Sequence, residues 1–164
     1  MPTGACLCGE IKISFTGEPV FRATCYCADC RKMPHMQTYQ IPKSAFSITQ
    51  GEPKVYTKVS DHDRVGSKDP LFDNTLLTWL KEISSHFCGT CGTVLFRTGG
   101  VPINKDNIGL RAGVLDDQSL LHKAPDIEVF AEKRPPWMAK IDGAVQLDAN
   151  YEPIQGDLAS AVGR

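Results

Sequence analysis

Residues 23–36, ATCYCADCRKMPHM, place Cys25, Cys27 and Cys30 within six positions of one another. A short segment with this spacing can direct several sulfur atoms at a single metal ion. Zinc takes four protein ligands where it only stabilises a fold, and three protein ligands with one open position where it catalyses a reaction. The stretch therefore predicts a metal site, and the remaining cysteines bear on whether that site is closed or open.

The other four cysteines form two close pairs, Cys6 with Cys8 and Cys88 with Cys91. Gly9 and Gly92 follow these pairs directly and suit the tight turn that aims two sulfurs at one centre. Together the two pairs supply a closed four-thiolate site and leave the 25–30 triplet with three ligands. A mixed arrangement, with Cys25 and Cys27 joining the 88–91 pair, also supplies four ligands.

A histidine or an aspartate is the alternative fourth ligand of the triplet. The candidates are Asp29, His35, His62, His86 and His122. Of the histidines, His35 is nearest to the triplet in sequence, whereas His86 is expected to belong to a strand entering the 88–91 turn. If one of these side chains closes the site, the triplet is structural rather than catalytic.

Length and composition indicate a single globular domain. The chain has 164 residues, of which 41% are hydrophobic and 23% are charged. A formal net charge of −1 and the lack of a basic run argue against nucleic acid as a partner. Apolar stretches are too short for a membrane span, and the start of the chain resembles no signal segment. We expect a soluble cytoplasmic protein with a small-molecule substrate, in which clustered cysteines serve metal binding or catalysis.

Short runs of alternating or apolar residues, separated by glycine and proline, predict a mainly β protein. The predicted strands are 11–15, 20–24, 37–41, 54–59, 93–97, 107–114 and 127–130. Helical spacing of leucines predicts a short helix over 74–83 within an inserted 60–84 loop, either packed on the core or acting as a lid. The segment after Trp137, and above all 146–164, is expected to form a loosely structured tail used in packing or dimer contact.

Four phrases in order carry a resemblance to a known family. They are residues 4–11 (GACLCGEI), 87–92 (FCGTCG), 111–117 (RAGVLDD) and 134–137 (RPPW), together with the triplet. The chain resembles the glutathione-dependent formaldehyde-activating family, also called the centromere protein V domain family. The resemblance implies a β-tent zinc fold of small antiparallel sheets over residues 1–145. It also implies two zinc ions, one structural on Cys6, Cys8, Cys88 and Cys91, and one catalytic on Cys25, Cys27 and Cys30.

The activity that the resemblance implies is a carbon–sulfur lyase reaction in which glutathione is a co-substrate. Alternatives on the same scaffold are zinc-assisted hydrolysis, dehydration or decarboxylation of a metabolite, or a non-catalytic zinc-stabilised binding module. Tyr26 stands where the family often has histidine. Tyr26 and His35 are the candidate acid–base residues beside the triplet. Arg31 and Lys32 are expected to offset the thiolate charge or to hold an acidic group of glutathione or the substrate.

Overall fold

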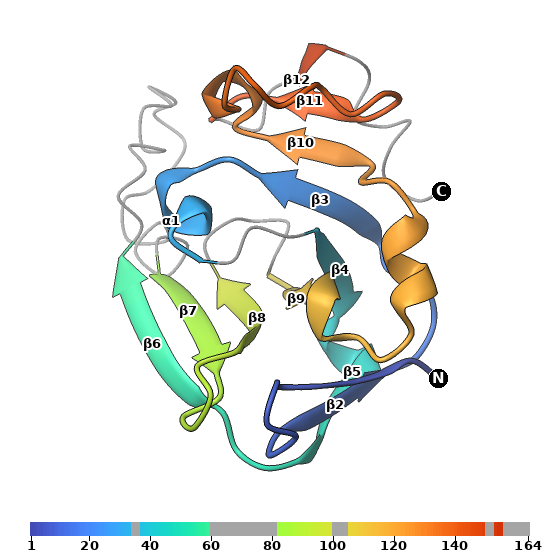
Figure 1. Cartoon of the computed structure of the whole chain (residues 1–164), viewed down its shortest axis with the longest axis vertical. Helices are drawn as coiled ribbons and strands as arrows, with labels where there is room; N and C mark the ends of the chain where they lie inside the picture. The colour runs from blue at the N-terminus through green and yellow to red at the C-terminus, as the bar shows by residue number, and fades with distance from the viewer. Residues whose placement is uncertain (34–36, 60–81, 100–104, 150–152, 156–164) are drawn as a thin grey trace.

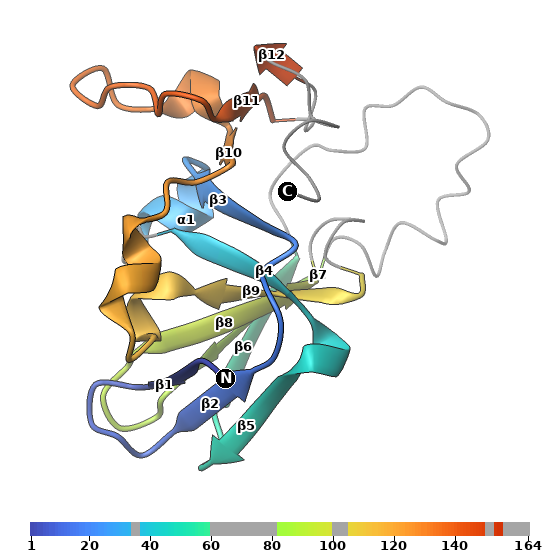
Figure 2. The ribbon, with the colours of Figure 1, turned by 90° about the vertical axis from the view of Figure 1, so that its right-hand side faces the viewer.

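The structure is a computed structural model that describes residues 1–33, 37–59, 82–99, 105–149 and 153–155. It is mainly β, as predicted, with strands gathered into two sheets. The smaller sheet has the order β1 (Thr3–Ala5), β2 (Lys12–Phe15), β5 (Phe46–Gln50), and its pairs are antiparallel. Figure 2 shows this sheet at one end of the molecule and β10–β12 at the other.

The larger sheet has nine strands among the described residues. Their order is β12 (Pro153–Gln155), β11 (Val145–Leu147), β10 (Ile127–Val129), β3 (Phe21–Cys25), β4 (Thr38–Pro42), β9 (Asn107–Arg111), β8 (Val94–Gly99), β7 (Glu82–Phe87) and β6 (Lys54–Val59). The described part of the chain also has short helices, namely α1 (Ala28–Arg31) and the 3-10 turns η1 (Lys43–Ala45), η3 (Ala112–Val114), η4 (Gln118–His122) and η5 (Ala131–Lys133). In Figure 1, α1 lies beside β3, near the end of β6 and the start of β7.

Each predicted strand corresponds to an observed one, with boundaries shifted by a residue or two, except that 107–114 ends early because Ala112–Val114 forms η3. Antiparallel pairing dominates as expected, but β10 pairs in parallel with both β3 and β11. The segment after Trp137 is less loose than predicted. Its residues Val145–Leu147 form β11, which is buried because it pairs with β10 in the interior.

The predicted helix over 74–83, and with it the possible lid, lies almost wholly outside the described residues. Its last two residues, Glu82 and Ile83, are described and are not helical. They begin β7 and pair with Val59 and Lys58 of β6, so tertiary pairing overrides the helical spacing at these two residues.

Two hydrophobic clusters form the core. One packs the small sheet against β4, β8 and β9, and it includes Cys6 and Cys88. The other lies around β3, β10 and β11, and it includes Tyr26, Cys27 and Cys30. Each cysteine group thus borders its own part of the core. In the part of the chain that the structure describes, no helix is long and apolar enough to span a membrane.

Candidate metal centres

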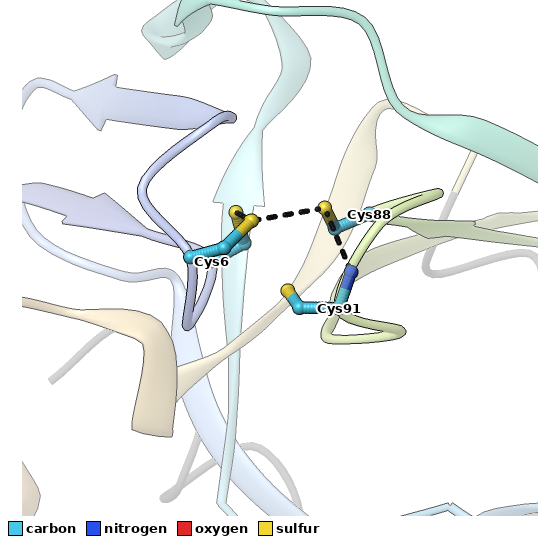
Figure 3. Close-up of side chains that lie close together, drawn as sticks. Cys6, Cys88 and Cys91 are labelled. Atoms are coloured by element: carbon cyan, nitrogen blue, oxygen red, sulfur yellow. Dashed lines mark hydrogen bonds between the residues drawn. The ribbon is translucent and has the colours of Figure 1, made fainter.

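The first group of cysteines joins two turns that are far apart in sequence. Cys6 and Cys8 lie between β1 and β2, and Cys88 and Cys91 lie between β7 and β8. The Sγ atoms of Cys6 and Cys8 are 3.5 Å apart, and those of Cys8 and Cys88 are 3.6 Å apart. All four sulfur atoms lie within 4.8 Å of one another. Figure 3 shows Cys6 facing Cys88 and Cys91 across the space between the turns.

The glycines after the two pairs have the conformation that the turns require. Gly9 and Gly92 have φ angles of 76° and 74°, in the left-handed region that side chains disfavour. The N–H of Gly9 donates to the Cys6 carbonyl, and the N–H of Gly92 donates to the Cys88 carbonyl, each at 2.9 Å. The sequence prediction of two tight turns is confirmed.

The second group lies where β3 runs into α1. Cys25 ends β3, Cys27 caps the N-terminus of α1, and Cys30 lies within the helix. The backbone N–H of Cys30 donates to Cys27 Sγ at 3.4 Å, so the cap itself brings two of the sulfurs together. All three sulfurs lie within 4.8 Å of one another. Cys27 and Cys30 are buried, whereas Cys25 is partly exposed.

The two groups lie at opposite ends of the β6–β7 ladder. Lys54 of β6 pairs with Phe87, which directly precedes the second cysteine pair, whereas Lys58 pairs with Ile83. Lys58 Nζ reaches Asp29 Oδ1 of α1, inside the triplet, at 2.9 Å. Four residues of strand correspond to about 13 Å. A mixed site that draws on both groups is therefore excluded, and the cysteines divide into four and three.

The donor atoms fit metal binding. Four sulfurs around a tetrahedral ion at the zinc–thiolate distance would lie about 3.8 Å apart, close to the spacings of the first group. The backbone also prepares these sulfurs to carry charge, since the N–H of Ile11 donates to Cys6 Sγ at 3.3 Å and that of Cys91 to Cys88 Sγ at 3.5 Å. Both cysteine groups can hold a metal ion, and soft thiolate donors suit zinc.

Two arginines from neighbouring strands face the triplet. Arg97 of β8 donates from Nη1 to Cys30 Sγ at 3.6 Å, and its Nη2 lies 3.9 Å from Asp29 Oδ2. Hydrogen bonds from Cys25 and Cys27, and then the charges of Arg111 and Arg97, lower the pKa of the Cys30 thiol well below its usual range, against the effect of burial. Thiolate is therefore the favoured form at this position.

Arg111, the last residue of β9, is 7% exposed. Its Nη1 donates to Thr38 Oγ1 at 3.1 Å, and its Nη2 lies 3.7 Å from the thioether sulfur of Met33. Among the residues that the structure describes, its Nε has no hydrogen-bond partner. Sequence reasoning did not identify Arg97 or Arg111 as site residues. Arg111 opened one of the family phrases, but nothing local connected either arginine with a cysteine triplet more than sixty residues away.

The other sequence candidates lie as follows. Arg31 and Lys32 are exposed at the end of α1, and their predicted binding role stays a prediction. Lys58 contacts Asp29 Oδ1, and neither oxygen of Asp29 lies within 4.8 Å of all three sulfurs, which argues against it as a fourth ligand. His86 belongs to β7, as predicted, and His122 ends η4. His35 and His62 lie outside the described residues.

Tyr26 lies between two triplet cysteines, but its side chain enters the core. Its hydroxyl donates to Glu128 Oε1 at 2.7 Å, and Glu128 is fully buried. Arg134 Nη1 lies 3.0 and 2.9 Å from the two oxygens of Glu128, and the Ile141 N–H donates to Oε2 at 3.2 Å. Burial and Glu128 raise the pKa of Tyr26 above its usual range. This geometry favours a positioning role for Tyr26 over acid–base chemistry.

The fold and the two sites define a β protein built around a four-cysteine and a three-cysteine cluster, each able to hold a metal ion. A family model described as glutathione-dependent formaldehyde-activating enzyme matches residues 1–133, so the chain belongs to this family and the resemblance seen in the sequence is confirmed. The structural search matched a crystal structure of a Rhodobacter sphaeroides protein from a structural-genomics programme. The TM-score is 0.50 and the identity 18%, over 75% of this chain and 97% of that one. This likeness supports the fold alone, and the search of curated proteins gave no match.

Proposed function

We propose that the chain is a zinc-dependent carbon–sulfur lyase that acts on a thiol adduct of a small carbonyl compound, such as the adduct of glutathione and formaldehyde. Membership of the formaldehyde-activating enzyme family supports an enzymatic role connected with glutathione. The proposal includes two zinc ions per chain and a cytoplasmic location, where reducing conditions keep such thiols free.

The division of the seven cysteines into a group of four and a group of three supports the proposal. The group of four, Cys6, Cys8, Cys88 and Cys91, is proposed to hold a structural ion between the two turns. The group of three, Cys25, Cys27 and Cys30, is proposed to hold the catalytic one. Zinc with one open position supplies Lewis acidity, which polarises a carbonyl oxygen or keeps a thiol deprotonated near neutral pH.

The protein residues around the triplet have separable tasks. Arg97 donates to Cys30 and steadies its negative charge, while Asp29 and Lys58 hold α1 against β6. In the cleavage direction the carbon–sulfur bond breaks and its electron pair stays on sulfur. The hydroxyl oxygen of the adduct becomes the carbonyl oxygen, and its proton passes to a base. From the sequence, His35 remains our candidate for that base.

The test is exchange between glutathione, formaldehyde and their adduct, measured by NMR with ¹³C-formaldehyde. The chain is expected to accelerate the exchange above the uncatalysed rate, and Cys27→Ser is expected to abolish the acceleration while the protein stays folded. Exchange at the uncatalysed rate with both metal sites loaded would contradict this substrate and favour another reaction on the same scaffold.

A further inference from the structure

We infer that Arg111 forms an anion-binding position beside the triplet, which selects thiols that carry a carboxylate close to their sulfur. The inference rests on the proposed function, because it assumes that a thiol occupies the open side of the triplet. It adds a residue and a substrate feature to that proposal.

Arg111 is a buried cation without an anionic hydrogen-bond acceptor among the described residues. The side chain is 7% exposed, and a buried guanidinium is costly unless its donors are satisfied. Only Nη1 has a good acceptor, the hydroxyl of Thr38 at 3.1 Å. By contrast, Arg22, whose side chain is 14% exposed, has the Asp126 carboxylate at 3.3 Å.

The Nη2 donor of Arg111 contacts the Met33 side chain, which a ligand can replace. Nη2 lies 3.7 Å from Met33 Sδ, and a thioether is a weak acceptor. Met33 is partly exposed and its side chain is flexible, so a ligand can displace it at small cost. A carboxylate is the acceptor whose planar geometry matches a guanidinium, and it would make charge-assisted bonds in place of the contact to sulfur.

Arg111 lies beside the triplet segment, since its Nη2 contacts Met33, three residues after Cys30. The hydrogen bond to Cys30 Sγ, however, comes from Arg97, which is also balanced by Asp29. Arg97 is therefore committed to the cysteine group, whereas Arg111 keeps donors for the carboxylate of a thiol bound at the triplet.

The experiment uses the full chain loaded with Co²⁺, whose visible absorption reports a new sulfur ligand. Mercaptoacetate and 2-mercaptoacetamide are titrated separately, and 3-mercaptopropionate and its amide form a second pair with a longer reach. The acid and the amide differ in thiol acidity as well as in charge. The quantity compared is therefore the ratio of the affinity for the acid to the affinity for the amide, measured in the wild type and in each variant. The ratio of at least one pair is expected to fall about tenfold or more in Arg111→Gln.

Arg111→Lys is the second variant, because it keeps a charge and much of the volume and guards against a folding failure of Arg111→Gln. The ratio is expected to fall here too, since an ammonium lacks the planar fork. Lys12→Gln, an exposed change on β2 in the other sheet, is the matched control and should leave the ratio unchanged. An unchanged ratio for both pairs in Arg111→Gln and Arg111→Lys would overturn the inference. So would a loss of discrimination that appears in Arg31→Gln or Lys32→Gln instead.

The same titration separates this inference from the proposed function. If the neutral amide binds but Arg111 does not affect the ratio, only the anion-binding position fails. If neither the amides nor the acids change the Co²⁺ spectrum while both sites hold metal, the triplet has no open position. The proposed function then fails together with this inference.

Discussion

Replacing Tyr26 by phenylalanine removes one hydroxyl from the buried connection between the triplet and β10. The lost contact is the 2.7 Å hydrogen bond to Glu128, and a hydrogen bond to a charged group contributes about 1.5–3 kcal/mol. Glu128 keeps Arg134 and the Ile141 N–H as partners, so the loss should be near the lower end, about 1.5–2 kcal/mol. For a chain of this size that corresponds to a fall in Tm of about 3–8 °C.

The variant is measured in the zinc-loaded state by denaturant unfolding and by the rate of zinc transfer to a chelator. Because Tyr26 lies between two triplet cysteines, zinc should leave that site faster, while the four-cysteine site is unaffected. Activity per zinc-loaded chain should be retained. A true acid–base role would instead cost about 10²–10⁴-fold in rate. Tyr56→Phe, at an exposed tyrosine of β6, is the matched control and should change none of these quantities.

The pH dependence has a definite sign. The pKa of Tyr26 is raised by folding, so its contribution is complete below the unfolded value of about 10 and is lost as pH rises beyond it. The stability difference between the wild type and Tyr26→Phe should be constant from pH 7 to 9 and should shrink above pH 10. Equal stability of the two proteins and equal rates of zinc release would refute the positioning role.

Three further predictions concern the metal sites and His86. Cys27→Ser should leave a folded chain with about one zinc instead of two, measured by metal analysis and circular dichroism. Cys88→Ser should leave the chain unfolded or insoluble. A structural zinc contributes about 10–16 kcal/mol of apparent free energy, which is comparable to the whole free energy of unfolding of a domain. A stable, folded Cys88→Ser protein would contradict the structural role. Burial lowers the pKa of His86, which stacks on Phe96 at 4.2 Å, so its contribution to stability is present above about pH 6.5 and is lost as pH falls. Between pH 7.5 and 6.0 the Tm should therefore fall further for the wild type than for His86→Phe, and equal falls would show that His86 does not titrate in this range.

Local spacing was enough to predict the cysteine groups, because each pair or triplet lies within one turn. The glycines after Cys8 and Cys91 made the turns recognisable, and the number of cysteines suggested the division into four and three. The structure added the separation of the two groups along β6 and β7, which excludes the mixed arrangement. The sequence had left that arrangement open, since spacing says nothing about which turns meet.

The strands that lie outside the predicted ranges include β5, β7 and β11; β5 alternates apolar and polar residues as a strand does, whereas β7 and β11 lack such a pattern. Residues 46–50 of β5 are mostly exposed, β7 carries polar residues, and β11 is three residues long and buried throughout. Their pairing comes from neighbouring strands rather than from their own composition. Segments of this kind are stabilised by tertiary context, which a single sequence does not display.

The residues that surround the triplet are the larger omission. Arg97 of β8 contacts Cys30, Arg111 of β9 contacts Met33, and Glu128 of β10 contacts Tyr26, which is 102 positions away. In the sequence, nothing distinguishes each of them from an ordinary charged residue within a short strand. Only the strand order of the larger sheet brings the three side chains to the end of β3.

A crystal structure of the zinc-loaded chain tests the central claim most directly, because it shows the fourth ligand at Cys25, Cys27 and Cys30. We predict four cysteine sulfurs around one zinc, and three cysteine sulfurs with solvent or a small thiol around the other. A protein side chain such as that of His35 as the fourth ligand of the triplet zinc would contradict the open site and the activity proposed from it.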